Sequence, residues 1–435
     1  MRTAVRPNPT EPALPEAETD SRLPFEHVLE LLLRHRENPS VEIERVLADH
    51  PQNLFGHCLR AAIIVRNDDS TARSKLTSSL TAIEAVRPNA DDPARRHASA
   101  ARAWLQGDLA LAAERYDAIV MDFPRDILAL VVAHAIDFRA NRRRVMQDRI
   151  ARVLPQWGVA VPGYASVLAM YAFALEENGQ YRRAEEIARR ALVLDPGHPA
   201  AIHVVAHVME MQGRALEGLA FLAATEPAWL EGTGLSVHLA WHRALFHLDA
   251  NDPESALAIY DSLIANTNSA EMSALADASA LLWRLQLRDI RLSGRWGKLA
   301  DRWERLTLDS TRPFYVVHAM MAFAAAGRTT AVARLLEALP YTDTNGTSLS
   351  LPEEAVARPF CEALLAFTRG DYAASVEWLE RVRHIADRCG GSLAQCNLIH
   401  LTFTEATARA RKGLDRAPVA ELAASKPASQ TKGLL

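Results

Sequence analysis

The feature that most constrains this chain is a repeated pair of apolar helical stripes separated by a short turn. The clearest copy lies between Leu168 and Pro196. Small residues let two antiparallel helices approach closely, Gly179 supplies the turn, and Asp195-Pro196 ends the second helix because proline cannot continue it. This pattern is typical of a tetratricopeptide repeat. Its stripes consist of Leu168, Tyr171, Ala172 and Leu175, then Ala184, Ala188, Ala191 and Leu192.

The turn residues recur with a period close to that of such repeats. Gly107 and Asn141 are 34 residues apart, and so are Gly179 and Gly213. The intervening step from Asn141 to Gly179 is 38 residues, so the period is stretched in places. We therefore expect an all-α fold, a tetratricopeptide-like α-solenoid or superhelix of about eight helical hairpins. Its remaining turn markers are Asn251, Gly294, Gly327 and Gly370.

Composition along the chain suggests four segments. Residues 1–20 and 412–435 contain too few apolar side chains to offset their ordering entropy, so we expect both ends to be disordered. Residues 21–90 have helical spacing but a weak repeat pattern, which predicts a helical N-terminal cap. The repeat superhelix should span residues 91–411. Within it, Tyr341 to Leu351 is the expected exposed loop.

Charge and motifs exclude several classes of function. A formal net charge of -4 on 435 residues gives no basic patch for nucleic acid or an anionic membrane. No apolar run of about 18 residues and no signal-peptide core occur, so we expect a cytoplasmic protein. Its four cysteines form no CxxC pair and should be reduced, buried thiols. Nucleophile-elbow, P-loop, dinucleotide-binding and kinase motifs do not occur.

Histidines gather on two neighbouring helices of the predicted inner face. One helix, about residues 200–212, carries His203, His207 and Glu210. The next inner helix, about residues 235–248, carries His238 and His242. Spacings of three and four residues place side chains on one side of a helix. We therefore expect these five residues to line one pocket.

This set suggests a metal site, and two other interpretations remain open. Histidines at i and i+4 can both reach one divalent first-row ion such as zinc or iron. Glu210 could add an oxygen ligand to the four histidines or act as a base on metal-bound water. The candidate catalytic residues are Glu210, His207 and Asp277. Alternatively, the cluster is a metal-free polar pocket for a ligand or for proton transfer, or its histidines are ordinary packed residues.

Further candidates for the pocket lie in apolar helical stretches. His134 and Asp137 occupy the preceding inner helix, and Asp277 and His318 occupy later ones. Trp241, between two histidines, is a candidate wall of the pocket. In contrast, we interpret Arg142-Arg143-Arg144 as a solvated helix end, and Ser392 after Gly390-Gly391 as a helix N-cap.

From about Arg95 to Ala410, the sequence resembles the tetratricopeptide repeat protein 38 family. Its landmarks include Asp148 to Pro155, Pro162-Gly163-Tyr164, Met170 to Glu177, Ala206 to Arg214, Trp241 to Leu248, Asp277 to Leu285 and Gly390-Gly391-Ser392. The resemblance implies that Tyr164 and Arg284 belong with the pocket, and it supplies no reaction. The polar positions of the family motifs are His203, His207, Glu210, Glu217, His238, His242, Asp277 and Arg284.

The chain also departs from the family pattern. It has His238-Leu239-Ala240-Trp241-His242 where the family usually has His-Asn-Trp-Trp-His, and Ser392-Leu393-Ala394-Gln395 where the family usually has Ser-His-Ala-Gln. These changes indicate a diverged, bacterial-type member with a reshaped pocket.

Three functions follow from these observations. The first is a repeat protein that binds a small molecule or a peptide in a His- and Glu-lined concave pocket. The second is a metal-dependent enzyme, and the third is a purely structural or interaction scaffold. Nucleic acid and membranes are not expected partners, and a homodimer is left open.

Overall fold

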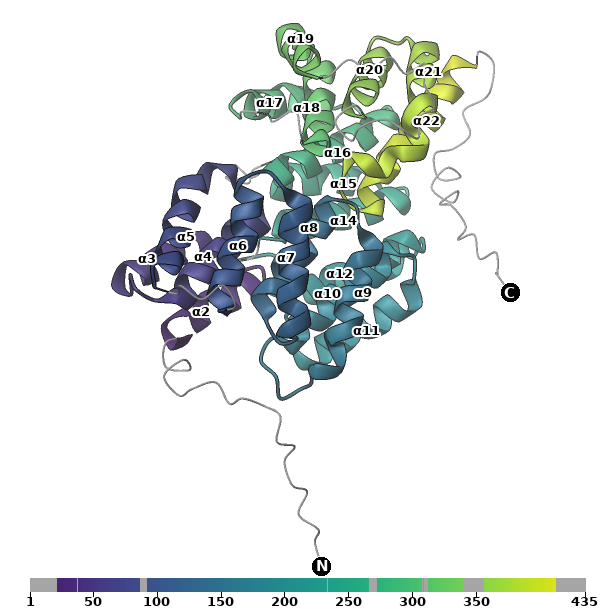
Figure 1. The fold of residues 1–435 in the computed structure, drawn as a ribbon. Coiled ribbons are helices and arrows are strands. Elements are labelled where there is room, and N and C mark those ends of the chain that lie inside the picture. The colour runs from purple at the N-terminus through teal and green to yellow at the C-terminus, as the bar shows by residue number, and fades with distance from the viewer. Residues whose placement is uncertain are drawn as a thin grey trace, which may run out of the picture. The chain divides into compact units, whose positions relative to one another are not determined.

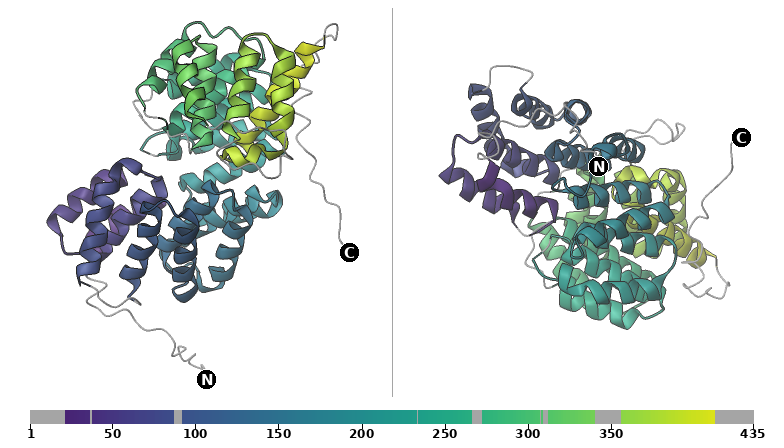
Figure 2. Two further views of the ribbon diagram at one scale, coloured as in Figure 1. Left: turned by 45° about the horizontal axis from the view of Figure 1, so that its top comes forward. Right: turned by 90° about the horizontal axis from the view of Figure 1, so that it is seen from below.

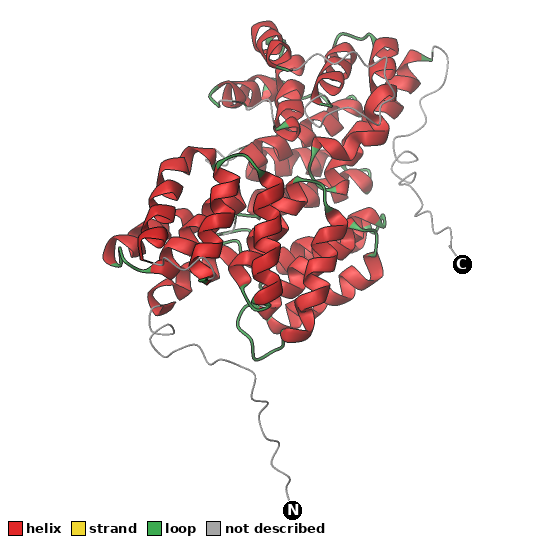
Figure 3. Cartoon of the chain, in the orientation of Figure 1, coloured by secondary structure: helices red, strands yellow, loops and turns green. Residues whose placement is uncertain are grey.

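The computed structural model describes residues 22–411 except 37, 87–91, 233, 266–271, 307, 309–311 and 340–355. The two ends expected to be disordered and the expected loop Tyr341 to Leu351 lie outside the described residues. Within the described ranges the secondary structure is helical and no β-strand occurs, as Figure 3 shows. None of these helices is long and apolar enough to cross a bilayer.

The described chain forms two compact units, one ending at Ile136 and the other beginning at Asp137. The expected boundary near residue 90 thus lies inside the first unit. This unit contains α2 (Glu26–Leu33), α3 (Pro39–Asp49), α4 (Leu54–Asn67), α5 (Arg73–Val86), α6 (Pro93–Leu105) and α7 (Leu109–Asp122). Helix α8 (Ile127–Arg139) spans the division.

The second unit continues the series of paired helices (Figures 1 and 2). Its helices are α9 (Arg143–Val153), α10 (Tyr164–Glu177), α11 (Tyr181–Leu194), α12 (Pro199–Met211), α13 (Ala215–Trp229), α14 (Ser236–Asp249), α15 (Pro253–Ile259), α16 (Met272–Leu287), α17 (Arg295–Glu304), α18 (Pro313–Ala325), α19 (Thr329–Ala338), α20 (Ala357–Thr368), α21 (Tyr372–Val382) and α22 (Leu393–Ala410). Short 3-10 or π segments lie at Leu23–Phe25, Ser70–Ala72, Leu154–Gln156, Tyr260–Ile264 and Arg383–Cys389.

The predicted turn residues have the backbone geometry that a helical hairpin needs. Gly107, Gly179 and Gly213 all have positive φ, and each lies two residues after the end of the first helix of its pair. Glycine adopts this left-handed conformation without steric cost and so ends the helix. The eight expected hairpins are present as the pairs from α6 and α7 to α20 and α21.

The Gly294 marker lies at the far end of the turn between α16 and α17. It is the N-cap of α17 and has positive φ, whereas the residue two positions after the end of α16 is Asp289, with a φ of 56°. Aspartate tolerates the left-handed conformation better than most residues with a side chain. A search for glycine and asparagine alone therefore found this turn but not the residue that ends α16.

The first helices of successive pairs pack against one another and form an inner layer. In the second unit this layer runs from α10 through α12, α14, α16 and α18 to α20. Fully buried Ala184, Ala188 and Ala191 let the outer helix α11 lie close to α10 and α12. The inner layer is therefore the continuous core of the unit.

Helix α22 packs onto this inner layer. It contacts α12 and α16 as well as its neighbour α21. The indole of Trp283 on α16 donates a 2.9 Å hydrogen bond to the hydroxyl of Thr402. Ser392 caps α22 in a capping box with Gln395, which confirms the predicted N-cap. The chain's own helix thus covers part of the face on which such repeats bind peptides.

The close approach of α13 and α14 depends on Gly218. A Cβ added there would lie well inside van der Waals contact with the ring of Phe246, which is fully buried. We expect Gly218→Ala to destabilise the protein by about 1–3 kcal/mol through overpacking. Gly297→Ala is the matched control, because its Cβ meets nothing and should stabilise α17 by about 0.5–1 kcal/mol. Urea unfolding measures both, and equal effects would contradict the packing argument.

Candidate functional site

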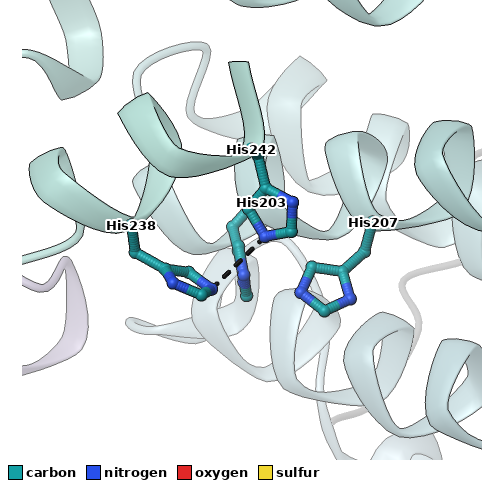
Figure 4. A group of neighbouring side chains, drawn as sticks. All are labelled: His203, His207, His238 and His242. Carbon is teal, nitrogen blue, oxygen red and sulfur yellow. Dashed lines mark hydrogen bonds between the residues drawn. The ribbon is translucent and has the colours of Figure 1, made fainter. Parts of the chain in front are cut away.

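Four imidazoles converge between α12 and α14. His203 and His207 come from α12, and His238 and His242 come from α14, one helical turn apart in each pair. One nitrogen of each ring lies within 4.8 Å of a nitrogen of every other ring. Figure 4 shows the rings turned toward a common centre. His207 and His242 are fully buried, whereas His203 and His238 are half-buried. The predicted convergence is present, and we call these residues the four-histidine cluster.

The separations within the cluster suit one metal ion. Nε2 of His242 lies 3.3 Å from Nε2 of His238. Two nitrogens bound tetrahedrally to one zinc ion at about 2.1 Å lie about 3.4 Å apart. The ring centroids of all four imidazoles are separated by 4.3 Å to 6.3 Å. The four residues could therefore hold a metal ion.

Buried carboxyl groups lie behind three of the imidazoles. Nδ1 of His242 donates to Glu210 at 2.7 Å, and Nδ1 of His238 donates to Asp277 at 2.8 Å. Nδ1 of His207 lies 3.4 Å from a carboxylate oxygen of Glu176. Metal-binding histidines in proteins usually donate their second ring nitrogen to a carboxylate or carbonyl, which fixes the ring and its tautomer. The hydrogen bonds of His238 and His242 have that arrangement.

The hydrogen bonds of His238 and His242 determine which atoms of the two rings face each other. A neutral imidazole carries one N–H, and in both rings a carboxylate accepts it at Nδ1. The two Nε2 atoms would then face each other with lone pairs. Either a proton or a metal ion between them removes this repulsion. Burial opposes the proton, but the Asp277 carboxylate outweighs burial and raises the pKa of His238.

Burial controls the charge of the remaining groups. It lowers the pKa of His207 to about 4, so this ring is neutral near pH 7 and can act as a metal ligand. Burial, reinforced by the Glu210 carboxylate, raises the pKa of Glu176 to about 8. For Glu177, burial and the charge of Glu176 raise the pKa to about 7.

Sequence reasoning missed three residues beside the cluster. Glu176 and Glu177 end α10 and were noted only within the family landmark Met170 to Glu177, yet both are buried. Arg143, predicted to lie in a solvated helix end, instead donates to Glu177 at 2.7 Å and is 13% exposed. Arg144 is solvated as predicted, with 80% of its side chain exposed. Two acidic residues at a helix C-terminus oppose the helix dipole, and this signal indicates that they have another role.

Aromatic and cationic side chains form the walls of the cluster. Trp241 stacks on His238 at 5.3 Å and lies edge-on to His242 at 4.8 Å. Phe173 stacks on His203 at 5.9 Å. The guanidinium of Arg284 lies 5.3 Å from the Trp241 ring and donates to the Ala394 carbonyl of α22. Burial lowers the pKa of Arg284 to about 10.

Helix α22 reaches the same region with its first turn. The backbone N–H of Leu393 donates to Glu177 at 3.3 Å, and the side-chain amide of Gln395 donates to Asp277 at 3.4 Å. A cavity of about 20 Å³, room for about one water molecule, lies between α14, α16 and α22 with Glu210 and Arg284 in its lining. The cluster is therefore enclosed on the α22 side.

Other predicted pocket residues have different surroundings. Asp137 is fully buried and forms ion pairs with Arg149 and Arg142. His318 donates to the Phe314 carbonyl of its own helix at 2.6 Å. Glu217, a family position, pairs on the surface with Arg214.

The last two predicted pocket residues lie at other places in the chain. Tyr164 begins α10, at the end of that helix opposite to Glu176, and has Arg190 over its ring. His134 belongs to the first unit, whereas the four histidines belong to the second.

Comparison with known proteins identifies the repeat. A tetratricopeptide repeat family model matches residues 165–208, which include most of α10, all of α11 and part of α12. Stacked repeats of this type form scaffolds for protein partners. The match ends one residue after His207. It therefore includes His203 and His207 on α12 and neither histidine of α14.

Two solved structures match this chain at 12% sequence identity. One is a monomeric mutant of IFIT1 with m7Gppp-AAAA; the match covers 84% of this chain and 95% of that chain, with a TM-score of 0.34. The other is Naa15/Naa10 bound to HypK-THB; the match covers 90% of this chain and 62% of that chain, with a TM-score of 0.27.

The ion pair of Asp137 and Arg149 is structural in this arrangement. Both side chains are almost completely buried. Arg149→Met should therefore destabilise the protein by about 1–3 kcal/mol, because the buried Asp137 carboxylate keeps only its ion pair with the partly exposed Arg142. Replacing both residues, with Asp137→Leu added, should recover most of that loss. Chemical denaturation of the three proteins tests this, and a single variant as stable as the parent would contradict it.

Proposed function

We propose that this tetratricopeptide-type helical repeat protein binds a divalent first-row transition-metal ion through His203, His207, His238 and His242. The observation that carries the proposal is the pair of facing Nε2 atoms, 3.3 Å apart, on rings whose Nδ1 atoms both donate to buried carboxylates. Neutral imidazoles suit zinc and iron in particular.

The proposal assigns roles to the candidate catalytic groups. His207 is a metal ligand, and Glu210 and Asp277 orient His242 and His238. Both carboxylates therefore act through the histidines and do not act as bases on substrate. A tetrahedral ion bound by four protein ligands has no open position, which is typical of structural zinc. Catalysis requires an ion such as iron that accepts further ligands, or the release of one imidazole.

The same contacts weigh against an open peptide groove at this place. Helix α22 covers part of the inner layer and donates to Glu177 and Asp277 at the cluster. A peptide would have to displace that helix. A small molecule entering beside the half-buried His203 and His238 remains compatible with the structure. Protein partners of the scaffold would bind elsewhere.

We further propose that the chain is a diverged member of the tetratricopeptide repeat protein 38 family. Support comes from the motif positions, because six of the eight polar residues gather in and around the four-histidine cluster and Arg284 adjoins Trp241. We also propose a cytoplasmic location, since the four cysteines are buried free thiols, as expected in a reducing compartment.

Metal content tests the site directly. Protein purified without chelators or reloaded with Zn²⁺ should contain at least one equivalent of first-row metal. The double variant His207→Ala/His242→Ala should lose it, whereas His400→Ala, an exposed histidine on α22, should keep it. Elemental analysis measures the content. Metal-free protein after reloading would refute the proposal and leave a proton between His238 and His242.

Asp277 should affect metal affinity without binding the metal. Asparagine can donate to Nδ1 of His238 and so favour the tautomer whose Nε2 carries hydrogen and cannot bind an ion. We expect Asp277→Asn to weaken Zn²⁺ binding about 10–100-fold. Asp301→Asn, which removes a surface ion pair with Arg328, is the control. Competition with a chromogenic chelator gives both affinities. Equal affinities would remove Asp277 from the site.

A further inference from the structure

We propose that a second divalent cation binds beside the four-histidine cluster, held by Glu176, Glu177 and His207. The inference rests on the proposed function, because His207 belongs to both sets of ligands. We call these three residues the carboxylate subsite. One ligand atom from each of them lies within 4.8 Å of the others.

The Glu176 side chain is the first observation that points to a ligand. It is fully buried, and neither of its carboxyl oxygens makes a hydrogen bond. A buried polar group without a hydrogen bond costs several kcal/mol in an apolar medium, so proteins rarely leave one unless it has another partner. A carboxylate in this state is a ready ligand for a cation.

His207 supplies the second observation. It is also fully buried, and neither ring nitrogen makes a hydrogen bond. Nδ1 lies 3.4 Å from a Glu176 oxygen, and Figure 4 shows a ring nitrogen facing the other imidazoles. The ring therefore lies between the two subsites. To bind one ion at each nitrogen, the neutral ring would have to release its remaining N–H proton to solvent, because a neutral imidazole has a lone pair on one nitrogen.

The negative charge of the two carboxyl groups of the subsite is only partly compensated. Glu176 and Glu177 are adjacent buried carboxyl groups, and Arg143 is the cation paired with them, through Glu177. Leu393 N–H provides Glu177 with a further hydrogen bond at 3.3 Å. Glu176 receives no such contact from hydrogen-bond donors. A divalent cation would compensate this carboxylate, whereas the alternative is a proton that stays on Glu176.

The donor set indicates the kind of cation. Two carboxylates and one imidazole suit Mn²⁺, Fe²⁺ or Zn²⁺, whereas soft Cu(I) prefers sulfur ligands. The subsite thus extends the cluster from a single ion toward a two-metal centre.

Mn²⁺ binding tests the carboxylate subsite. The full-length chain is stripped with chelator, loaded with one equivalent of Zn²⁺, which imidazole ligands suit, and titrated with Mn²⁺, which carboxylates suit. Electron paramagnetic resonance counts the free Mn²⁺. We expect one bound Mn²⁺ per chain beside the Zn²⁺. Glu176→Gln, which is nearly isosteric, should abolish Mn²⁺ binding and retain the Zn²⁺. Glu186→Gln, exposed on α11, should leave both unchanged.

The outcomes separate the two proposals. Retained Zn²⁺ without bound Mn²⁺ in the parent protein would overturn the carboxylate subsite and leave the four-histidine site standing. A parent protein that binds neither ion would overturn both proposals. Mn²⁺ bound by the Glu176→Gln variant would show that Glu176 is not a ligand. The stoichiometry of the parent protein is decisive by itself, so the test does not depend on whether the variant folds.

Discussion

The cost of burying charge governs the centre of this protein. Carboxyl groups and imidazoles from α10, α12, α14 and α16 lie within one enclosed region of the inner layer. In such surroundings an ionised group persists only with a compensating partner. Glu210 and Asp277 have histidines, and Glu177 has Arg143. Proton sharing and metal binding would each complete that compensation.

The repeat architecture determines how closely the four imidazoles approach one another. Each inner helix packs on the next, so residues one repeat apart come to lie side by side. His207 and His242 are 35 positions apart, and their ring centroids lie 4.6 Å apart. Tetratricopeptide stacks normally offer this inner surface to a partner. Here α22 of the same chain lies against it, and the polar residues face inward to one another.

The sequence predicted the periodic part of the structure. Spacings of four residues and a period near that of the repeat were enough to place His203, His207, His238 and His242 together, because both follow from helix geometry. The sequence did not indicate the roles of Glu176, Glu177 and Arg143, because charged residues at helix ends are usually solvated. A repeat pattern predicts contacts between neighbouring hairpins only. It does not predict that α22 packs on the distant helices α12 and α16, so the contacts of Leu393 and Gln395 could not be predicted.

The place of α22 in the chain has a consequence for biosynthesis. The hydrogen bond from Leu393 to Glu177 spans 216 positions, and that from Gln395 to Asp277 spans 118. A ribosome delivers the four histidines long before it delivers these residues. The hairpins can stack as they emerge, but the enclosure around the imidazoles closes only after α22 has been synthesised. During that interval the histidines are open to the surrounding solution on this side, and an ion can enter before α22 docks.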